Sequence, residues 1–238
     1  MDNLHKHTLI RFKTPLSVDE TVSFRGAVLE QFGTNVLFHN HTDEGYRYSY
    51  PLIQYKSMDG RAALLGIDAG ADVLLAFPGK CPMEVRIGKR ITRLEVDSVN
   101  TYSVPAIVPD NKSHYYRMYD WLPFNQDNYK DFRKMLLLTD RIHALENILS
   151  GNILSYAKGM GYFVDCPLHI GLISIDQHKS FAYKGVQLYS MHITFTANVF
   201  LPAHVGLGKS VSIGHGVVYP ISYSKPYDNS DLIPAWRS

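Results

Sequence analysis

The alternation of apolar and polar positions in the first half of the chain predicts a small mixed domain. Residues 7–13 alternate loosely enough for a strand, and Pro15 ends the pattern. Ser17 and Glu20 then have the spacing of a capping box, and apolar residues recur at helical spacing up to Gly33. The elements expected after this helix are strands at 46–57 and 61–67, a helix at 69–77 and a strand at 83–87.

The two strands at 46–57 and 61–67 are expected to form a hairpin, because the turn residues Asp59 and Gly60 separate them. The full order is then strand, helix, hairpin, helix and strand. This order is typical of a ferredoxin-like domain.

A second set of elements follows a segment, 91–109, that has the pattern of a connection. The expected elements are a strand at 115–122, an amphipathic helix at 138–156, and strands at 164–174, 186–201 and 211–223. We expect Gly151 to interrupt the helix and Gly159 and Gly161 to close it.

The second set lacks one element, because nothing between residues 201 and 211 has a helical pattern. The second half is therefore interpreted as a degenerate copy of the first. The prediction is an α+β protein with two tandem ferredoxin-like (RRM-like) domains, at residues 1–100 and 101–238.

Composition adds few constraints on function. The 238 residues are 45% hydrophobic, which suffices for two small cores, and a 19% charged fraction with net charge +2 implies no strong electrostatic field. Cys81 and Cys166 are far apart, so we expect reduced thiols without a disulfide framework or a zinc site. No segment approaches the roughly 18 apolar residues of a membrane span, so we expect a soluble, cytoplasmic protein without membrane contact.

The densest motif is the glycine-rich segment His204–Gly216, which contains two glycine pairs around Lys209. Exposed backbone amides together with one ammonium suit phosphate oxygens, although glycines between strands also serve tight turns and bulges. Residues 203–210 resemble a nucleotide-binding loop with alanine in place of the first glycine. That interpretation is disfavoured because β-formers follow the loop, where a nucleotide-binding loop needs the N-terminus of a helix.

The glycine-rich segment after two ferredoxin-like patterns resembles the signature of the repeat-associated mysterious protein (RAMP) superfamily. Within it, the chain is similar to the endoribonucleases that process CRISPR precursor RNA, in the subgroup with paired histidines after the first helix, where His39 and His41 lie. The resemblance implies a metal-independent reaction without a cofactor. A ribose 2′-hydroxyl attacks the adjacent phosphate and leaves a 2′,3′-cyclic phosphate and a 5′-hydroxyl. The implied partner is CRISPR repeat RNA, and other effector-complex subunits or a second copy of the chain remain open.

His39 and His41 are the candidate general acid and base, since imidazole titrates near neutral pH. They are two positions apart, so in an extended segment their side chains would share one face. A metal site is not expected, because no third ligand of suitable spacing lies nearby. Tyr46 and Lys56 are the candidates for stabilising charge on the phosphorane-like transition state. The alternatives are two solvated loop histidines and an ordinary packed tyrosine.

The candidate RNA-binding residues form a basic run and a glycine-rich set: Arg86, Lys89, Arg90 and Arg93, and Gly206, Gly208, Lys209, Ser210, Gly214, His215 and Gly216. A solvated strand end would explain the basic run equally well. Two other functions stay open at this point. One is a non-catalytic RNA-binding subunit of the same superfamily, and the other is a nucleotide-binding enzyme.

Overall fold

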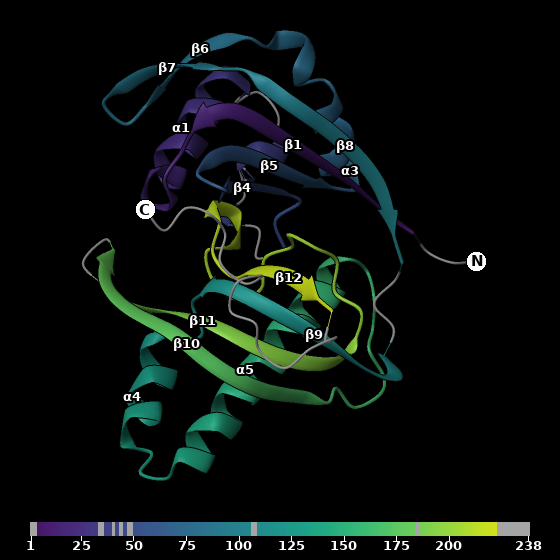
Figure 1. The fold of residues 1–238 in the computed structure, drawn as a ribbon, viewed down its shortest axis with the longest axis vertical. Helices are drawn as coiled ribbons and strands as arrows, with labels where there is room; N and C mark the ends of the chain where they lie inside the picture. The colour runs from purple at the N-terminus through teal and green to yellow at the C-terminus, as the bar shows by residue number, and fades with distance from the viewer. Residues whose placement is uncertain are drawn as a thin grey trace. The chain divides into compact units, whose positions relative to one another are not determined.

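The computed structural model describes residues 4–32, 36–39, 41–42, 45–46, 50–105, 109–183 and 186–222. Its internal contacts divide the chain into two units (Figure 1). Unit 1 contains Met1–Ala106 and Ser212–Gly214, and unit 2 contains Ile107–Val211 and His215–Tyr223.

Unit 1 is built on one antiparallel sheet with the strand order β4-β5-β1-β8. Its strands and main helices are, in chain order, β1 (His5–Pro15), α1 (Thr21–Phe32), β4 (Ile53–Met58), β5 (Arg61–Ile67), α3 (Ala69–Leu75) and β8 (Val96–Val104). Helices α1 and α3 lie against the same sheet (Figure 1). This connectivity and strand order are those of a ferredoxin-like domain, so the fold predicted for the first half is confirmed.

Local sequence signals explain where these elements begin and turn. The Ser17 backbone N–H donates to Glu20 Oε2 at 3.0 Å, which completes the predicted capping box before α1, at the short 3₁₀ helix Val18–Glu20. Asp59 and Gly60 have φ angles of 52° and 70° and form the hairpin turn between β4 and β5.

Aromatic rings fill the core between the sheet and its helices. Phe12 lies edge-on to Phe24 and Phe77, with ring centroids 6.1 and 5.6 Å apart, and Phe24 lies 5.9 Å from Tyr55. All four side chains are fully or almost fully buried. Edge-to-face packing adds to the apolar burial and fixes α1 on the sheet.

The fourth strand of the sheet was predicted wrongly. Residues 83–87 do form a strand, β6 (Met83–Ile87), but it pairs only with β7 (Arg90–Leu94) in a separate hairpin after the 3₁₀ helix Pro78–Lys80. The fourth strand is β8, inside the segment that was expected to be a connection. β8 is an edge strand with few buried positions, so its polar sequence gives little strand signal.

Unit 2 repeats the arrangement, with the strand order β10-β11-β9-β12. Its elements are β9 (Pro109–Trp121), α4 (Gln126–Lys134), α5 (Leu138–Gly159), β10 (Ile170–Tyr183), β11 (Val186–Val199), the 3₁₀ helix η3 (Val211–Ile213) and β12 (Val217–Ile221). The segment between β11 and β12 contains η3 as its only helix, as expected for a degenerate copy. The prediction of two tandem α+β, ferredoxin-like domains is therefore confirmed.

The strands predicted at 164–174 and 211–223 begin later, at Ile170 and Val217, and two predictions for the helices of unit 2 were wrong. Helix α5 continues through Gly151, because its neighbours Leu149 and Ile153 are buried and this packing offsets the roughly 1 kcal/mol cost of a helical glycine. Helix α4 has a mostly polar sequence and was not expected. It is held by its Asn125 cap, whose side chain accepts from the Asn128 N–H at 2.7 Å, and by Phe132, whose ring lies 4.6 Å from that of Phe124.

Across the described parts of the chain, we find no helix with both the length and the apolar composition that a bilayer crossing requires.

Candidate functional site

Three of the four candidate catalytic residues, His39, His41 and Tyr46, lie on three short elements between α1 and β4. These are α2 (Val36–His39), β2 (His41–Thr42) and β3 (Gly45–Tyr46). In the β2-β3 ladder His41 is directly opposite Tyr46. Residues opposite each other in an antiparallel ladder share a face, so two of the four candidates hold adjacent register positions. The side chains of His39, His41 and Tyr46 lie outside the described part of the structure.

The expected geometry of the histidine pair was wrong. His39 is the last residue of a helical turn and His41 begins a strand, so the two do not belong to one extended segment. The helical turn before His39 is stabilised by Phe38, which is only 2% exposed and has its ring 5.6 Å from that of Phe32. The turn forms because it buries this aromatic side chain in the core.

A hydrogen bond ties this helical turn to the sheet. The Tyr55 hydroxyl on β4 donates to the Phe38 carbonyl oxygen at 3.5 Å, and Tyr55 is itself buried. Burial also raises the pKa of Tyr55, so the hydroxyl keeps its proton for this bond. The backbone that leads into His39 is thus anchored on the strand that also carries Lys56.

Lys56 is fully buried on β4, at 0% exposure. Its Nζ donates to Gln54 Oε1 at 2.9 Å, and Gln54 Nε2 in turn donates to the Tyr50 hydroxyl at 2.8 Å. Burial lowers the pKa of Lys56 to about 7, because the charged ammonium loses its hydration. The lysine therefore changes charge near neutral pH, unlike a surface lysine.

The basic run divides into one structural and three exposed residues. Arg90 donates to the Pro15 carbonyl oxygen at 3.0 Å and to Glu20 Oε1 at 3.2 Å, so it holds β7 to the start of α1. Arg86, Lys89 and Arg93 are exposed on the β6-β7 hairpin. The other face of the hairpin carries Val85, Ile87 and Leu94, which belong to the core. Three of the four basic residues can therefore reach a polyanion.

The glycine-rich segment is tightly bonded within unit 2 at both of its ends. The Leu207 N–H donates to the Gly216 carbonyl oxygen at 2.9 Å, and the Gly216 N–H donates to the Asp120 carbonyl oxygen at 3.0 Å. His215 Nδ1 also lies 3.2 Å from the Asp120 carbonyl oxygen. The amides of Leu207 and Gly216 are thus used inside the protein, which contradicts the expectation of bare amides at these two positions.

Packing explains the glycines at these positions. A Cβ at Gly216, where φ is 65°, would overlap the Leu207 carbonyl group, and a Cβ at Gly208, where φ is 95°, would lie 3.0 Å from the indole of Trp121. The exposed part of the segment is Lys209, between the half-buried Gly208 and Ser210. Partial burial lowers the pKa of the Lys209 ammonium. Ser212–Gly214 are grouped with unit 1.

The segment lacks the geometry of a nucleotide-binding loop. Ser210 is followed by the three-residue η3 and then by β12, where a phosphate-binding loop would continue into the first turn of a long helix. Within the described ranges, no group of three or more His, Cys, Asp or Glu side chains is placed to hold a metal ion.

Sequence reasoning missed two polar clusters. The first is the Lys56–Gln54–Tyr50 chain of hydrogen bonds, for which the alternation of polar residues along β4 was the available signal. The second lies on the sheet of unit 2. There Arg117 forms an ion pair with Asp176 and lies over the ring of Tyr119, 5.6 Å from its centroid. The sequence gives no signal for the second cluster, because β9 and β10 are distant in the chain.

Comparison with known proteins agrees with the two-unit fold. Residues 3–104 match the model of the Cas6b N-terminal domain, and residues 108–221 match that of the Cas6b C-terminal domain. The chain belongs to the Cas6b family. The CRISPR RNA-processing resemblance seen in the sequence is therefore confirmed at the level of the family.

Solved structures of Cas6b proteins share the fold. A crystal structure of Cas6b superposes with a TM-score of 0.81 at 23% identity, over 91% of this chain and 100% of that one. A second, described as the CRISPR RNA processing endoribonuclease Cas6b, superposes with a TM-score of 0.70 at 22% identity, over 93% and 100%. An uncharacterized protein of Methanocaldococcus jannaschii is 33% identical over 113 residues, which are 47% of this chain and 74% of that protein.

Proposed function

We propose that this member of the Cas6b family is an endoribonuclease that cleaves CRISPR repeat precursor RNA. The observation that carries the proposal is the match of both halves of the chain to the two Cas6b domain models. The solved Cas6b structure of the same fold is described as a CRISPR RNA processing endoribonuclease. The partner is CRISPR repeat RNA.

The proposed reaction is attack of a ribose 2′-hydroxyl on the neighbouring phosphate without a metal ion. The oxygen–phosphorus bond to the 5′-oxygen breaks, and the products are a 2′,3′-cyclic phosphate and a 5′-hydroxyl. One imidazole removes the 2′-hydroxyl proton and the other protonates the leaving oxygen. We assign these two roles to His39 and His41, whose short elements adjoin in the chain.

Tyr46 and Lys56 are proposed to stabilise the charge of the transition state. The register of Tyr46 opposite His41 supports the first assignment, because it gives the hydroxyl-bearing residue the position next to an imidazole-bearing one. Lys56 is fully buried, so we propose that its ammonium acts through its electrostatic field and not by contact with the phosphate. A charge inside a protein acts over a longer distance than one in water.

RNA binding is assigned to the exposed cations of both units. Lys209 and the half-buried Gly208, Ser210, Gly214 and His215 form one proposed contact, and Arg86, Lys89 and Arg93 form the other. Gly206 and Gly216 are buried, so we propose that they shape the segment and do not contact RNA. Arg90 contributes less, because its guanidinium is already bonded to Glu20 and Pro15. Each phosphate contact releases counterions, so binding should weaken as salt increases.

Cleavage of repeat RNA by single alanine variants of His39 and His41 tests the proposal. We expect each substitution to slow cleavage by about 10²-fold or more, as for loss of a general acid or base, with RNA affinity retained. His143→Ala is the matched control, because His143 is an exposed histidine on α5 with 74% side-chain exposure. Wild-type cleavage should persist in excess chelator and yield cyclic-phosphate ends.

Two results would contradict parts of this proposal. Unchanged cleavage by both single variants and by the double variant would show that the two histidines are not the acid and base. RNA binding without any cleavage by the wild type would favour the alternative function, a non-catalytic RNA-binding subunit.

A further inference from the structure

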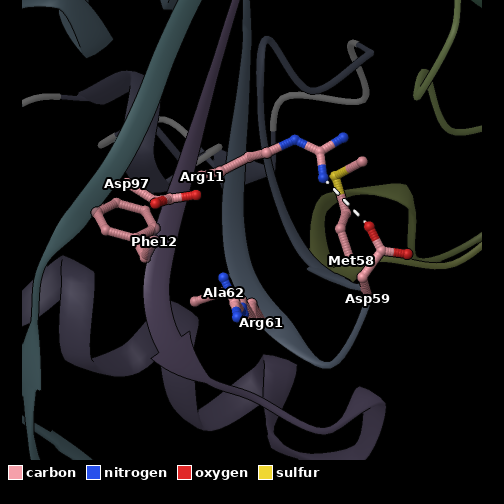
Figure 2. Close-up of a pocket in the computed structure, with 7 residues that line it drawn as sticks. All are labelled: Arg11, Phe12, Met58, Asp59, Arg61, Ala62 and Asp97. Atoms are coloured by element: carbon pink, nitrogen blue, oxygen red, sulfur yellow. Dashed lines mark hydrogen bonds and ion pairs between the residues drawn. The ribbon is translucent and has the colours of Figure 1, made fainter. Parts of the chain in front are cut away.

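Unit 1 contains a small pocket where β1 parts from its neighbours (Figure 2). Up to Arg11, β1 pairs with β5 in regular register, and pairing resumes only at Pro15, which is opposite Arg61. On the other side Arg11 is opposite Ser98 and Phe12 is opposite Val96, so Asp97 is an extra residue in β8. Such a bulge redirects the side chain of the extra residue.

The pocket is lined by two guanidinium groups and two carboxylates, from Arg11, Arg61, Asp59 and Asp97. Arg11 forms an ion pair with Asp59 at 3.3 Å (Figure 2). In the described ranges the side chains of Arg61 and Asp97 form neither hydrogen bonds nor ion pairs with other residues. The Asp97 carboxylate interacts electrostatically with the ammonium of Lys13, which is itself ion-paired with Glu95. Phe12 and Met58 line the floor of the pocket, but both are almost fully buried, at 0% and 5% exposure, so the accessible lining is mainly polar.

The volume of the pocket limits the size of its ligand. It is about 190 Å³, below the roughly 300–1,000 Å³ of sites for drug-sized molecules. One ring system fits this range better than a whole nucleotide or a peptide.

The charges of the pocket limit the chemistry of its ligand. The charges of the two arginines and the two aspartates sum to zero. An anionic ligand would be attracted by the guanidinium groups and repelled by the carboxylates, so it would gain little binding energy. A neutral ligand with both donors and acceptors is favoured. Among the RNA bases, guanine has adjacent N–H donors on one edge for a carboxylate and the acceptors O6 and N7 for a guanidinium.

We infer that this pocket binds a single unstacked guanine of the RNA substrate. Asp97 accepts from the N1–H and N2–H donors, and Arg61 donates to O6 and N7. Sequence-selective proteins commonly bind unpaired RNA bases by their edges in this way. The inference rests on the proposed function, since it concerns recognition of the same RNA.

Binding of free nucleosides tests the pocket independently of cleavage. Guanosine, adenosine, cytidine and uridine would be titrated into the full chain and followed by NMR. We expect guanosine to bind about tenfold or more tightly than the other three, since a bidentate pair discriminates bases to this degree. Asp97→Asn and Arg61→Gln should each remove the preference, whereas Asp19→Asn, which removes an exposed carboxylate elsewhere in unit 1, should keep it. Thermal unfolding would verify that all variants are folded.

Repeat RNA provides a second measurement. Replacing each guanosine in turn by inosine removes the N2 amine, and at one position this should weaken binding to the wild type about tenfold but leave binding to Asp97→Asn unchanged. Equal affinity for all four nucleosides, or inorganic phosphate competing with guanosine, would overturn the inference while leaving the cleavage proposal intact. Guanosine selectivity without RNA cleavage would support the pocket and contradict the proposed function.

Discussion

The buried imidazole of His7 should make unit 1 sensitive to acid. His7 lies on β1, is 0% exposed, and packs on the ring of Tyr102 with centroids 5.5 Å apart. Neither ring nitrogen has a hydrogen-bond partner among the described residues. Burial lowers its pKa from 6.5 to about 4, an effect that the charge of Asp68 opposes and that of His5 reinforces.

The sign and size of the effect follow from this pKa. The unfolded chain binds a proton near pH 6.5 and the folded protein only near pH 4, so stability is lost as the pH falls through this window. At about 1.4 kcal/mol for each tenfold difference, the loss is about 3 kcal/mol by pH 4. A substitution that removes the imidazole, His7→Leu, should remove this loss.

Hydrogen exchange measured by mass spectrometry suits this prediction, because it reports β1 and β5 separately from unit 2. Between about pH 7 and pH 4, the opening free energy of β1 should fall by about 3 kcal/mol more in the wild type than in His7→Leu. His143→Leu, which removes an exposed histidine, serves as the control. An equal pH dependence in the wild type and His7→Leu would refute the reasoning.

Three further predictions concern the glycine-rich segment and the buried lysine. Gly216→Ala should lower the free energy of unfolding by about 1–3 kcal/mol, because the new Cβ would meet the Leu207 carbonyl group at a positive φ. Gly151→Ala in α5 should raise the free energy of unfolding by about 1 kcal/mol. Urea unfolding followed by fluorescence would measure both changes. Lys209→Ala should reduce the slope of log affinity against log salt for repeat RNA by about 1, and an unchanged slope would exclude a phosphate contact. Burial lowers the folded pKa of Lys56 from 10.5 to about 7, so the stability of the wild type should rise by about 4 kcal/mol from pH 7 to 10.5, and Lys56→Met should abolish this rise. Lys56→Met should also slow cleavage of repeat RNA, and a normal cleavage rate would show that Lys56 does not act in catalysis.

Strong local signals were enough to predict most of the fold from the sequence. The capping box at Ser17 and Glu20 and the turn at Asp59 and Gly60 are contacts between neighbours in the chain, so their residue types determine them directly. The glycine-rich segment likewise identified the superfamily. Periodicity also located most of the strands, because burial of one face imposes it.

The tertiary structure alone decided the features that depend on distant partners. β8 and not β6 completes the first sheet, because pairing with β1 turns a polar segment into an edge strand. Arg90 stabilises the fold because its guanidinium lies within hydrogen-bond distance of Glu20. Its sequence neighbours Arg86 and Lys89 are also basic, so residue type alone does not distinguish the structural arginine from the exposed cations. The pKa of Lys56 shifts because the folded protein excludes water from around its ammonium. Burial, charge and register depend on which segments meet in space, and the residue types along one segment do not specify that.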